Sequence, residues 1–127
     1  MRKWLPIGLV VSAFFVLVCS RATAGGDVSP TEAARLVKET KNLQLIDVRT
    51  AAEYAGGHLA GAKLIPVQEL ADRLAEIDKK RPVLLYCRTD RRSGNALRLL
   101  EEHGFTGAKH IAGGINAWQA AGLPVTR

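Results

Sequence analysis

Hydrophobic and polar positions after residue 25 fall into two kinds of segment that alternate along the chain. Short apolar runs occupy residues 43–48, 62–66, 82–86 and 108–112. Runs of this length, bounded by turn-forming and charged residues, predict buried β-strands. The run at 82–86 reads Pro-Val-Leu-Leu-Tyr, which predicts the most deeply buried strand.

The segments between these runs carry apolar residues at helical spacing. Two capping boxes predict helix starts, one formed by Ser29 with Glu32 and the other by Thr50 with Glu53. The helix that follows Thr50 is short, because a glycine pair at 56–57 ends it. Longer helices are predicted over residues 30–39, 67–78, 93–103 and 114–121.

The alternation of short apolar strands with helices indicates an α/β fold, with a central parallel sheet of about five strands and helices on both faces. Residues 25–127 contain no internal repeat, low-complexity tract or linker, so they are expected to form a single domain. In such a sheet, ligands bind beyond the carboxyl ends of the strands. Cys87 directly follows the strand predicted at 82–86, and this is where a ligand is expected.

Residues 1–24 have the pattern of a secretory signal peptide. A positively charged start precedes an uncharged apolar run at 5–18, and Ala-Thr-Ala at 22–24 supplies the small residues that signal peptidase requires. We therefore expect cleavage after residue 24 and an exported mature protein without a membrane anchor. A lipoprotein signal, with Cys19 as the lipidated residue, is the alternative, and the bulky Val18 before it disfavours this.

Signal cleavage changes both the charge and the cysteine content of the chain. The full sequence has 18 basic and 12 acidic residues, and cleavage removes three basic ones, so the net charge falls from +6 to +3. The remaining basic residues are dispersed, and nucleic acid is therefore not an expected partner. Cys19 leaves with the signal. Cys87 then cannot form an internal disulfide, and it is either a buried inert thiol or a functional one.

The sequence Tyr-Cys-Arg-Thr-Asp-Arg-Arg-Ser-Gly at residues 86–94 joins a predicted strand to a predicted helix. The helix, for which Ser93 is the expected N-cap, points free N–H groups toward Cys87 and favours a thiolate and a bound anion. Three arginines add positive charge: Arg88, Arg91 and Arg92. The first two have the alternative interpretation of solvated loop residues. The three histidines of the chain are scattered, and their spacing does not predict a metal site.

Three motifs resemble those of the rhodanese domain, a sulfurtransferase module. Residues 45–66, LIDVRTAAEYAGGHLAGAKLIP, resemble its first signature, and residues 86–94 resemble its active-site loop. Residues 111–125, IAGGINAWQAAGLPV, resemble its closing segment. The motifs occur in the order of the family, and the resemblance as a whole spans essentially all of residues 27–125. The chain is similar to single-domain exported rhodaneses of the periplasmic phage-shock type.

The resemblance implies that Cys87 takes the outer sulfur of thiosulfate or a similar anionic donor, becomes a persulfide, and passes this sulfur to cyanide or a thiol. It also implies a monomer that needs no metal or organic cofactor. The loop residues are implied to bind substrate, and backbone N–H groups to hold the persulfide; the residues are Arg88, Thr89, Asp90, Arg91, Arg92 and Ser93. Three further residues are implied to be structural support, with Glu53 as a partner of Arg49: Asp47, Arg49 and Glu53.

The length of the active-site loop favours sulfur transfer over the other activities known on this fold. Related phosphatases have five residues between the cysteine and the arginine, whereas four residues separate Cys87 from Arg92. A phosphatase or an arsenate reductase is therefore disfavoured. A persulfide carrier that delivers sulfur to a protein partner would use the same residues and remains an alternative. The intact cysteine and loop disfavour an inert interaction domain.

Asp90 departs from the pattern, because many loops of this type carry glycine at its position. A carboxylate near the sulfur opposes both thiolate formation and the entry of an anion. Asp90 is therefore expected either to turn outward and pair with an arginine or to narrow the range of substrates. Asp90→Gly is predicted to leave the fold intact and to speed thiosulfate turnover.

Overall fold

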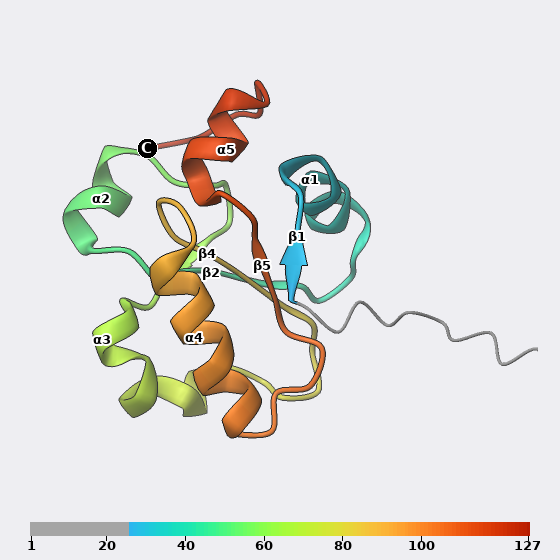
Figure 1. The fold of residues 1–127 in the computed structure, drawn as a ribbon, viewed down its shortest axis with the longest axis vertical. Coiled ribbons are helices and arrows are strands. Elements are labelled where there is room, and N and C mark those ends of the chain that lie inside the picture. Colours follow the sequence, from blue (N-terminus) through green and yellow to red (C-terminus); the bar gives the residue numbers. More distant parts are fainter. Residues whose placement is uncertain (1–25) are drawn as a thin grey trace, which may run out of the picture.

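The computed structural model describes residues 26–127, in which five strands form one parallel sheet (Figure 1). The strand order is β1-β5-β4-β2-β3, with β4 at the centre. The strands are β1 (Asp27–Val28), β2 (Gln44–Asp47), β3 (Lys63–Leu64), β4 (Val83–Tyr86) and β5 (Lys109–Ile111). The predicted α/β class is confirmed. The predicted signal peptide and Cys19 lie outside the described residues.

Helices cover both faces of the sheet (Figure 1). On one face α1 packs against α5, and on the other α3 packs against α4. The helices are α1 (Pro30–Glu39), α2 (Ala51–Gly56), α3 (Val67–Leu70), α4 (Arg91–Glu102) and α5 (Gly114–Ala120), with a 3₁₀ helix η1 (Ala71–Glu76) after α3. The helix predicted over 67–78 is therefore divided into an α-helix and a 3₁₀ helix, and η1 itself is kinked at Arg73, whose backbone (φ −119°, ψ 17°) leaves the helical region.

The alternation of side chains along β4 assigns each residue to one of two cores. Leu84 and Tyr86 belong to the core beneath α1 and α5. Leu85 and Cys87 belong to the core beneath α3 and α4. Because successive side chains of a strand point to opposite faces, the position of Cys87 directly after β4 directs its side chain toward α4.

The first strand was not predicted, because two residues are too few to show a period. β1 is recognised only through its pairing with β5, in which Asp27 lies opposite His110 and Val28 opposite Ile111. This pairing brings the start of the described chain to the same sheet as the strand that precedes Cys87. Asp27 thereby becomes a neighbour of residues far away in the sequence.

The start of α4 differs from its prediction in a way that changes the role of one residue. The helix begins at Arg91 with Asp90 as its N-cap, and the Gly94 N–H donates to the Asp90 carbonyl at 2.8 Å. The predicted N-cap role of Ser93 is therefore wrong. Ser93 lies inside the first turn, fully buried, and its hydroxyl faces the sheet instead of capping the helix.

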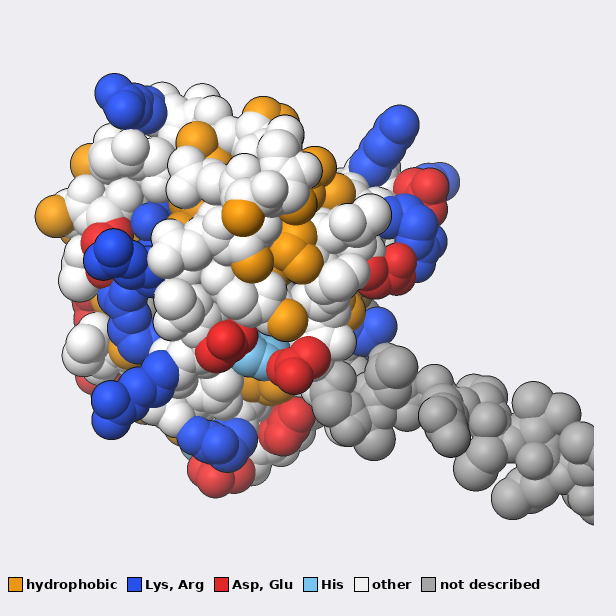
Figure 2. Space-filling view, turned by 45° about the horizontal axis from the view of Figure 1, so that its top comes forward, with side chains coloured by type: hydrophobic (Ala, Val, Ile, Leu, Met, Phe, Trp, Pro, Cys, Tyr) orange, Lys and Arg blue, Asp and Glu red, His pale blue; other side chains and the backbone are white. Residues whose placement is uncertain are grey.

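Charged side chains are distributed over the surface. On the face shown in Figure 2, basic side chains lie in separate groups, several of them beside acidic ones.

None of the helices within residues 26–127 has the length and apolar character needed to cross a lipid bilayer.

Candidate active site

Cys87 lies at the carboxyl end of the central strand, directly below the first turn of α4. Its side chain is 1% exposed, and its thiol donates to the Ser93 hydroxyl, with Sγ and Oγ 3.3 Å apart. It is the free cysteine of the described region. The sulfur therefore has a polar neighbour on one side and a mostly apolar core around it.

The backbone of the loop after Cys87 is held by the start of α5. The Ile115 N–H donates to the Cys87 carbonyl at 2.9 Å, and the Asn116 N–H donates to the Arg88 carbonyl at 3.2 Å. In a trans peptide the C=O and the following N–H point in opposite directions. The N–H groups of Arg88 and Thr89 therefore point away from α5, toward the inside of the loop.

Six consecutive backbone N–H groups of this loop are free for a ligand. Within residues 26–127, none of the backbone N–H groups of Arg88 to Ser93 donates a hydrogen bond. The last three belong to the first turn of α4, where intrahelical acceptors are missing and the positive end of the helix dipole lies. Such a set of N–H groups favours a thiolate, a persulfide or a small anion.

The Asp90 carboxylate joins the loop to the N-cap of α5. Its Oδ1 accepts the Gly113 N–H at 2.7 Å, and no arginine pairs with it among the described residues. Asp90 is exposed, but the arginine partner expected in the first of its two alternatives is absent within the described region, and the second, a narrower range of substrates, stays a prediction. The carboxylate instead satisfies a backbone donor that a glycine at position 90 would leave without its partner.

This contact sharpens the prediction for Asp90. We expect Asp90→Asn to keep the acceptor for Gly113 while removing the charge. If Cys87 reacts with an anionic sulfur donor such as thiosulfate, as the sequence predicts, this reaction should be several-fold faster at low salt, and the melting temperature should stay within a few degrees. Asp90→Gly and Asp90→Ala lose the acceptor, which costs about 1 kcal/mol of unfolding free energy. Steady-state rates at two ionic strengths and thermal unfolding measure both effects. An Asp90→Asn rate equal to or below that of the wild type would contradict the role given to the charge.

The guanidinium of Arg92 forms an ion pair with the carboxylate of Glu53. Its Nη1 and Nη2 donate to the two carboxylate oxygens of Glu53 at 2.6 and 2.9 Å. The capping box predicted at the start of α2 is confirmed, since Glu53 also accepts the Thr50 N–H.

The expected pairing of Glu53 with Arg49 is wrong, because both carboxylate oxygens of Glu53 accept from Arg92. Glu53 instead joins α2 to α4, while Arg88 and Arg91 are exposed and unpaired within the described region.

The Arg92–Glu53 pair predicts an acid-sensitive contribution to stability. The hydrogen bonds from Arg92 lower the pKa of Glu53 from its ordinary value of 4.5 to about 2. A carboxylate whose pKa is lower in the folded state stabilises the fold above the unfolded pKa, and this stabilisation is lost as the pH falls from about 4.5 to about 2. Glu53→Gln should therefore lower the unfolding free energy at pH 6 by about 1 kcal/mol or less, and the two curves should converge near pH 2.

Urea unfolding between pH 2 and pH 6 measures this difference. Glu102→Gln is the matched control, because Glu102 is exposed and makes no ion pair within residues 26–127. A constant offset between Glu53→Gln and the wild type across this pH range would show that the pair is not the source.

Asp47 and Arg49 form a buried ion pair at the end of β2. Asp47 is 0% and Arg49 6% exposed, and Arg49 Nη2 lies 2.7 Å from Asp47 Oδ2 and 2.7 Å from the Gly57 carbonyl oxygen. Burial opposes the charge of Arg49, and the hydrogen bonds and charge of Asp47 outweigh it, so that the pKa of Arg49 is raised. The pair fastens the end of β2 to the end of α2.

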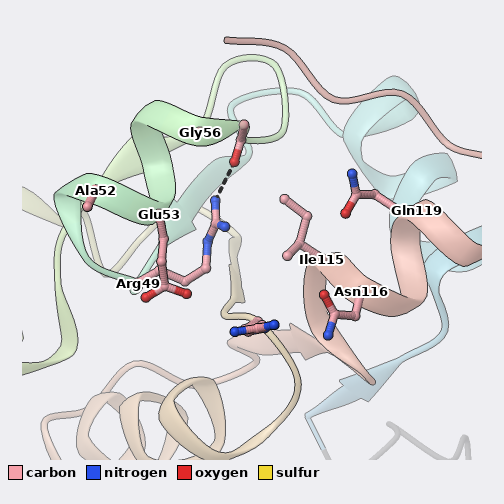
Figure 3. A pocket seen from close by; sticks show the side chains of 9 residues that line it. Arg49, Ala52, Glu53, Gly56, Ile115, Asn116 and Gln119 are labelled. Atoms are coloured by element: carbon pink, nitrogen blue, oxygen red, sulfur yellow. Dashed lines mark hydrogen bonds between the residues drawn. The ribbon is translucent and has the colours of Figure 1, made fainter.

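A recess of about 250 Å³ lies beside the loop. Figure 3 shows Arg49 and Glu53 on one side of it and Ile115, Asn116 and Gln119 of α5 on the other. Arg88 also lines it, whereas Cys87 does not. The recess is smaller than the pockets of drug-sized ligands, and its polar side chains suit a small hydrophilic molecule.

Comparisons with known proteins agree with this arrangement. Residues 29–121 match the family described as Rhodanese-like domain. The chain belongs to the rhodanese-like domain family. A protein named Sulfurtransferase from Allochromatium vinosum is 33% identical over 99 residues, which cover 78% of this chain and 92% of that protein. Thiosulfate sulfurtransferase GlpE of Shewanella oneidensis is 32% identical over 83 residues, covering 65% and 82% of the two chains.

A solved rhodanese-like domain protein from Staphylococcus aureus has the same fold. It is 30% identical, with a TM-score of 0.67, and the match covers 80% of this chain and 98% of that one. Several other curated relatives are longer, and this chain spans only 26% to 62% of their length. Rhodanese-like domains thus occur both as nearly whole chains and as parts of larger proteins among these relatives.

The sequence did not predict two residues, His110 and Asp27, that are linked to the loop after Cys87 through Ser93. The Ser93 hydroxyl lies 2.8 Å from His110 Nδ1, and His110 Nε2 in turn contacts a carboxylate oxygen of Asp27. His110 and Asp27 come from β5 and β1, so only the register of the sheet brings them to the loop. The alternation of residues in the run at 108–112 would have placed His110 on the same face as Ser93, but not Asp27.

Proposed function

We propose that this rhodanese-like domain is a thiosulfate sulfurtransferase of the periplasm that carries sulfur as a persulfide on Cys87. The observation that supports this most directly is the set of six free N–H groups, from Arg88 to Ser93, around the loop of one buried cysteine. Donors of this kind stabilise negative charge on sulfur and bind an oxyanion at the same place.

The reaction is a nucleophilic displacement at sulfur. The Cys87 thiolate attacks the outer sulfur of thiosulfate, a new S–S bond forms, and the bond between the outer and the central sulfur breaks. Sulfite leaves with the electron pair of that bond, and the outer sulfur remains on Cys87 as a persulfide anion. Cyanide or a thiolate then attacks the outer sulfur, and the Cys87 thiolate is restored. The persulfide itself carries the sulfur, so this cycle requires neither a metal nor an organic cofactor.

We assign the binding and guidance of the anionic sulfur donor toward the loop to Arg88 and the recess that it lines. Arg88 is exposed and lines the recess, and within the described chain it has no carboxylate partner. Arg92, in contrast, is neutralised by Glu53 and acts on the loop mainly by fixing the start of α4. We therefore assign the steering of the donor to Arg88 and a supporting role to Arg92. The relative GlpE, whose name includes thiosulfate, favours this donor.

The intact mass of the protein after incubation with thiosulfate tests the proposal. The wild type should gain one sulfur atom and release one equivalent of sulfite, while Cys87→Ser gains none. Cys19→Ser is the control for the other cysteine of the full chain, and it should gain sulfur as the wild type does. A wild type that gains no sulfur, or a Cys87→Ser variant that still gains it, would remove the basis of the proposal.

Steady-state turnover distinguishes an enzyme from a persulfide carrier. With thiosulfate as donor, thiocyanate should form continuously when cyanide is the acceptor, at a rate that saturates with both substrates. A protein that takes up one sulfur and releases it only to a protein thiol would instead be a carrier.

A further inference from the structure

We propose that Ser93, His110 and Asp27 form a relay that removes the proton from the buried Cys87 thiol. Neither the mechanism above nor the family match assigns a role to His110 or Asp27. The proposal rests on the proposed function only in taking Cys87 as the nucleophile. His110 and Asp27 are positioning residues in this scheme, because they act on the sulfur through Ser93.

The relay is a continuous line of contacts on one face of the sheet. Cys87 Sγ lies 3.3 Å from Ser93 Oγ, and Ser93 Oγ lies 2.8 Å from His110 Nδ1. His110 Nε2 contacts Asp27 Oδ1. The register explains this line, since Leu85 lies opposite His110, His110 lies opposite Asp27, and Cys87 is two residues beyond Leu85.

The acceptors along the line fix which nitrogen of His110 carries a proton. A carboxylate only accepts hydrogen bonds, so Asp27 requires an N–H at Nε2. Nδ1 of the neutral imidazole is then an acceptor, and it faces the Ser93 hydroxyl. The thiol of Cys87 is left to donate to Ser93 Oγ. Each contact of the line therefore has one donor and one acceptor, all oriented in the same direction, and the Asp90 carbonyl oxygen, 3.3 Å from Ser93 Oγ, is a second acceptor for the Ser93 hydroxyl proton.

The proton transfer conserves charge and needs no other reactant. The thiol proton passes to Ser93 Oγ while the Ser93 hydroxyl proton passes to His110 Nδ1. The products are a Cys87 thiolate and a His110 imidazolium, whose Nε2–H remains bonded to the Asp27 carboxylate. The Ser93 hydroxyl is unchanged overall, as in other hydroxyl-mediated relays.

Burial makes this route useful to Cys87. The thiol is 1% exposed, so bulk water has little access to its proton. The side chain of Asp27 is 71% exposed and that of His110 7%, so the relay leads from the core to the solvent. On the face shown in Figure 2, a histidine side chain is visible between acidic side chains.

Other charged groups near the relay are the same in all variants that test it. They are Asp90, Arg91 and Arg92 on the loop and the first turn of α4, Asp47 at the end of β2, and Lys109 beside His110. Of these, the charge of Arg92 acts on both Cys87 and Asp47. A difference between variants at His110 or Asp27 is therefore not explained by these groups.

The rate of alkylation of Cys87 by iodoacetamide tests the relay without thiosulfate. In the Cys19→Ser background, His110→Asn keeps a hydrogen-bonding side chain beside Ser93 but cannot take up a proton. We expect it to slow alkylation at pH 7 by about tenfold or more and to move the pH–rate profile toward higher pH. Asp27→Asn, an exposed change with little risk to folding, should slow alkylation by a smaller factor.

His103→Asn is the matched control, because His103 is exposed on α4, remote from the relay. It should alkylate at the wild-type rate with the wild-type pH profile. Thermal unfolding establishes that each variant is folded, since an unfolded chain would alkylate faster. Wild-type rates and profiles in both Asp27→Asn and folded His110→Asn would overturn the relay. These alkylation rates are independent of sulfur uptake, so the relay can fail while the proposed function holds, and the reverse.

Discussion

Replacing Asp47 by asparagine is expected to lower the unfolding free energy by about 3–5 kcal/mol, because it leaves a charged Arg49 in the core without its counter-ion. Asp47 is fully buried, and both of its oxygens accept from the Arg49 guanidinium at 2.7–3.1 Å. The amide of asparagine presents one acceptor and one donor to a group that only donates. Urea unfolding at neutral pH measures the loss.

Two further variants separate the buried charge from other causes of this loss. Asp47→Leu combined with Arg49→Met removes both charges, and it should recover most of the stability if an unpaired charge is the cause. Glu32→Gln breaks an exposed pair with Arg35, and it should change the unfolding free energy far less than Asp47→Asn does, because solvent screens exposed pairs. A double variant as unstable as Asp47→Asn alone would show that the pair has a role beyond mutual neutralisation.

The sheet was predictable from the sequence because its central strands are buried on both faces. β4 is a run of four buried, largely apolar residues, and β2 has two apolar residues at its centre, as buried strands of an α/β fold do. The same reasoning located Cys87 at a carboxyl end of the sheet. The boundaries were less certain, and the two-residue shift at the start of α4 changed Ser93 from a cap into a neighbour of the sulfur.

The partners of the site residues were not predictable, because they depend on contacts between segments distant in the sequence. The resemblance implied Arg49 as the partner of Glu53, yet Glu53 pairs with Arg92, which is 39 positions away. Asp27 reaches His110 across 83 positions through a strand of only two residues. Local patterns identify which residues are polar and near a strand end, whereas the register of the sheet decides which of them meet.

Gly114→Ala is expected to disrupt both the fold and sulfur uptake, because this glycine lets α5 contact the active-site loop. A Cβ at position 114 would lie 2.4 Å from the Cys87 carbonyl oxygen and 2.6 Å from the Arg88 carbonyl carbon. Gly114 also has a φ of +58°, which side chains rarely adopt. Backbone strain and overpacking together should cost about 2–5 kcal/mol of unfolding free energy.

The loss of activity should exceed what destabilisation alone explains. The added methyl pushes α5 away from the carbonyls of Cys87 and Arg88, and these carbonyls orient the free N–H groups of the loop. A displacement of about 1 Å in a catalytic group costs about a hundredfold in rate, so sulfur uptake should fall by this order in the folded variant. Uptake is measured by intact mass over time at a temperature where the variant is folded.

Gly61→Ala separates the conformational strain from the collision with the loop. Gly61 has a φ of +79°, and a Cβ there would meet nothing within 4 Å. This variant should therefore lose only about 1–2 kcal/mol and take up sulfur at the wild-type rate. If Gly114→Ala matched Gly61→Ala in both stability and uptake, the approach of α5 would not control the loop. A selective loss in Gly114→Ala would instead show that the N–H groups act only when α5 holds the loop in place.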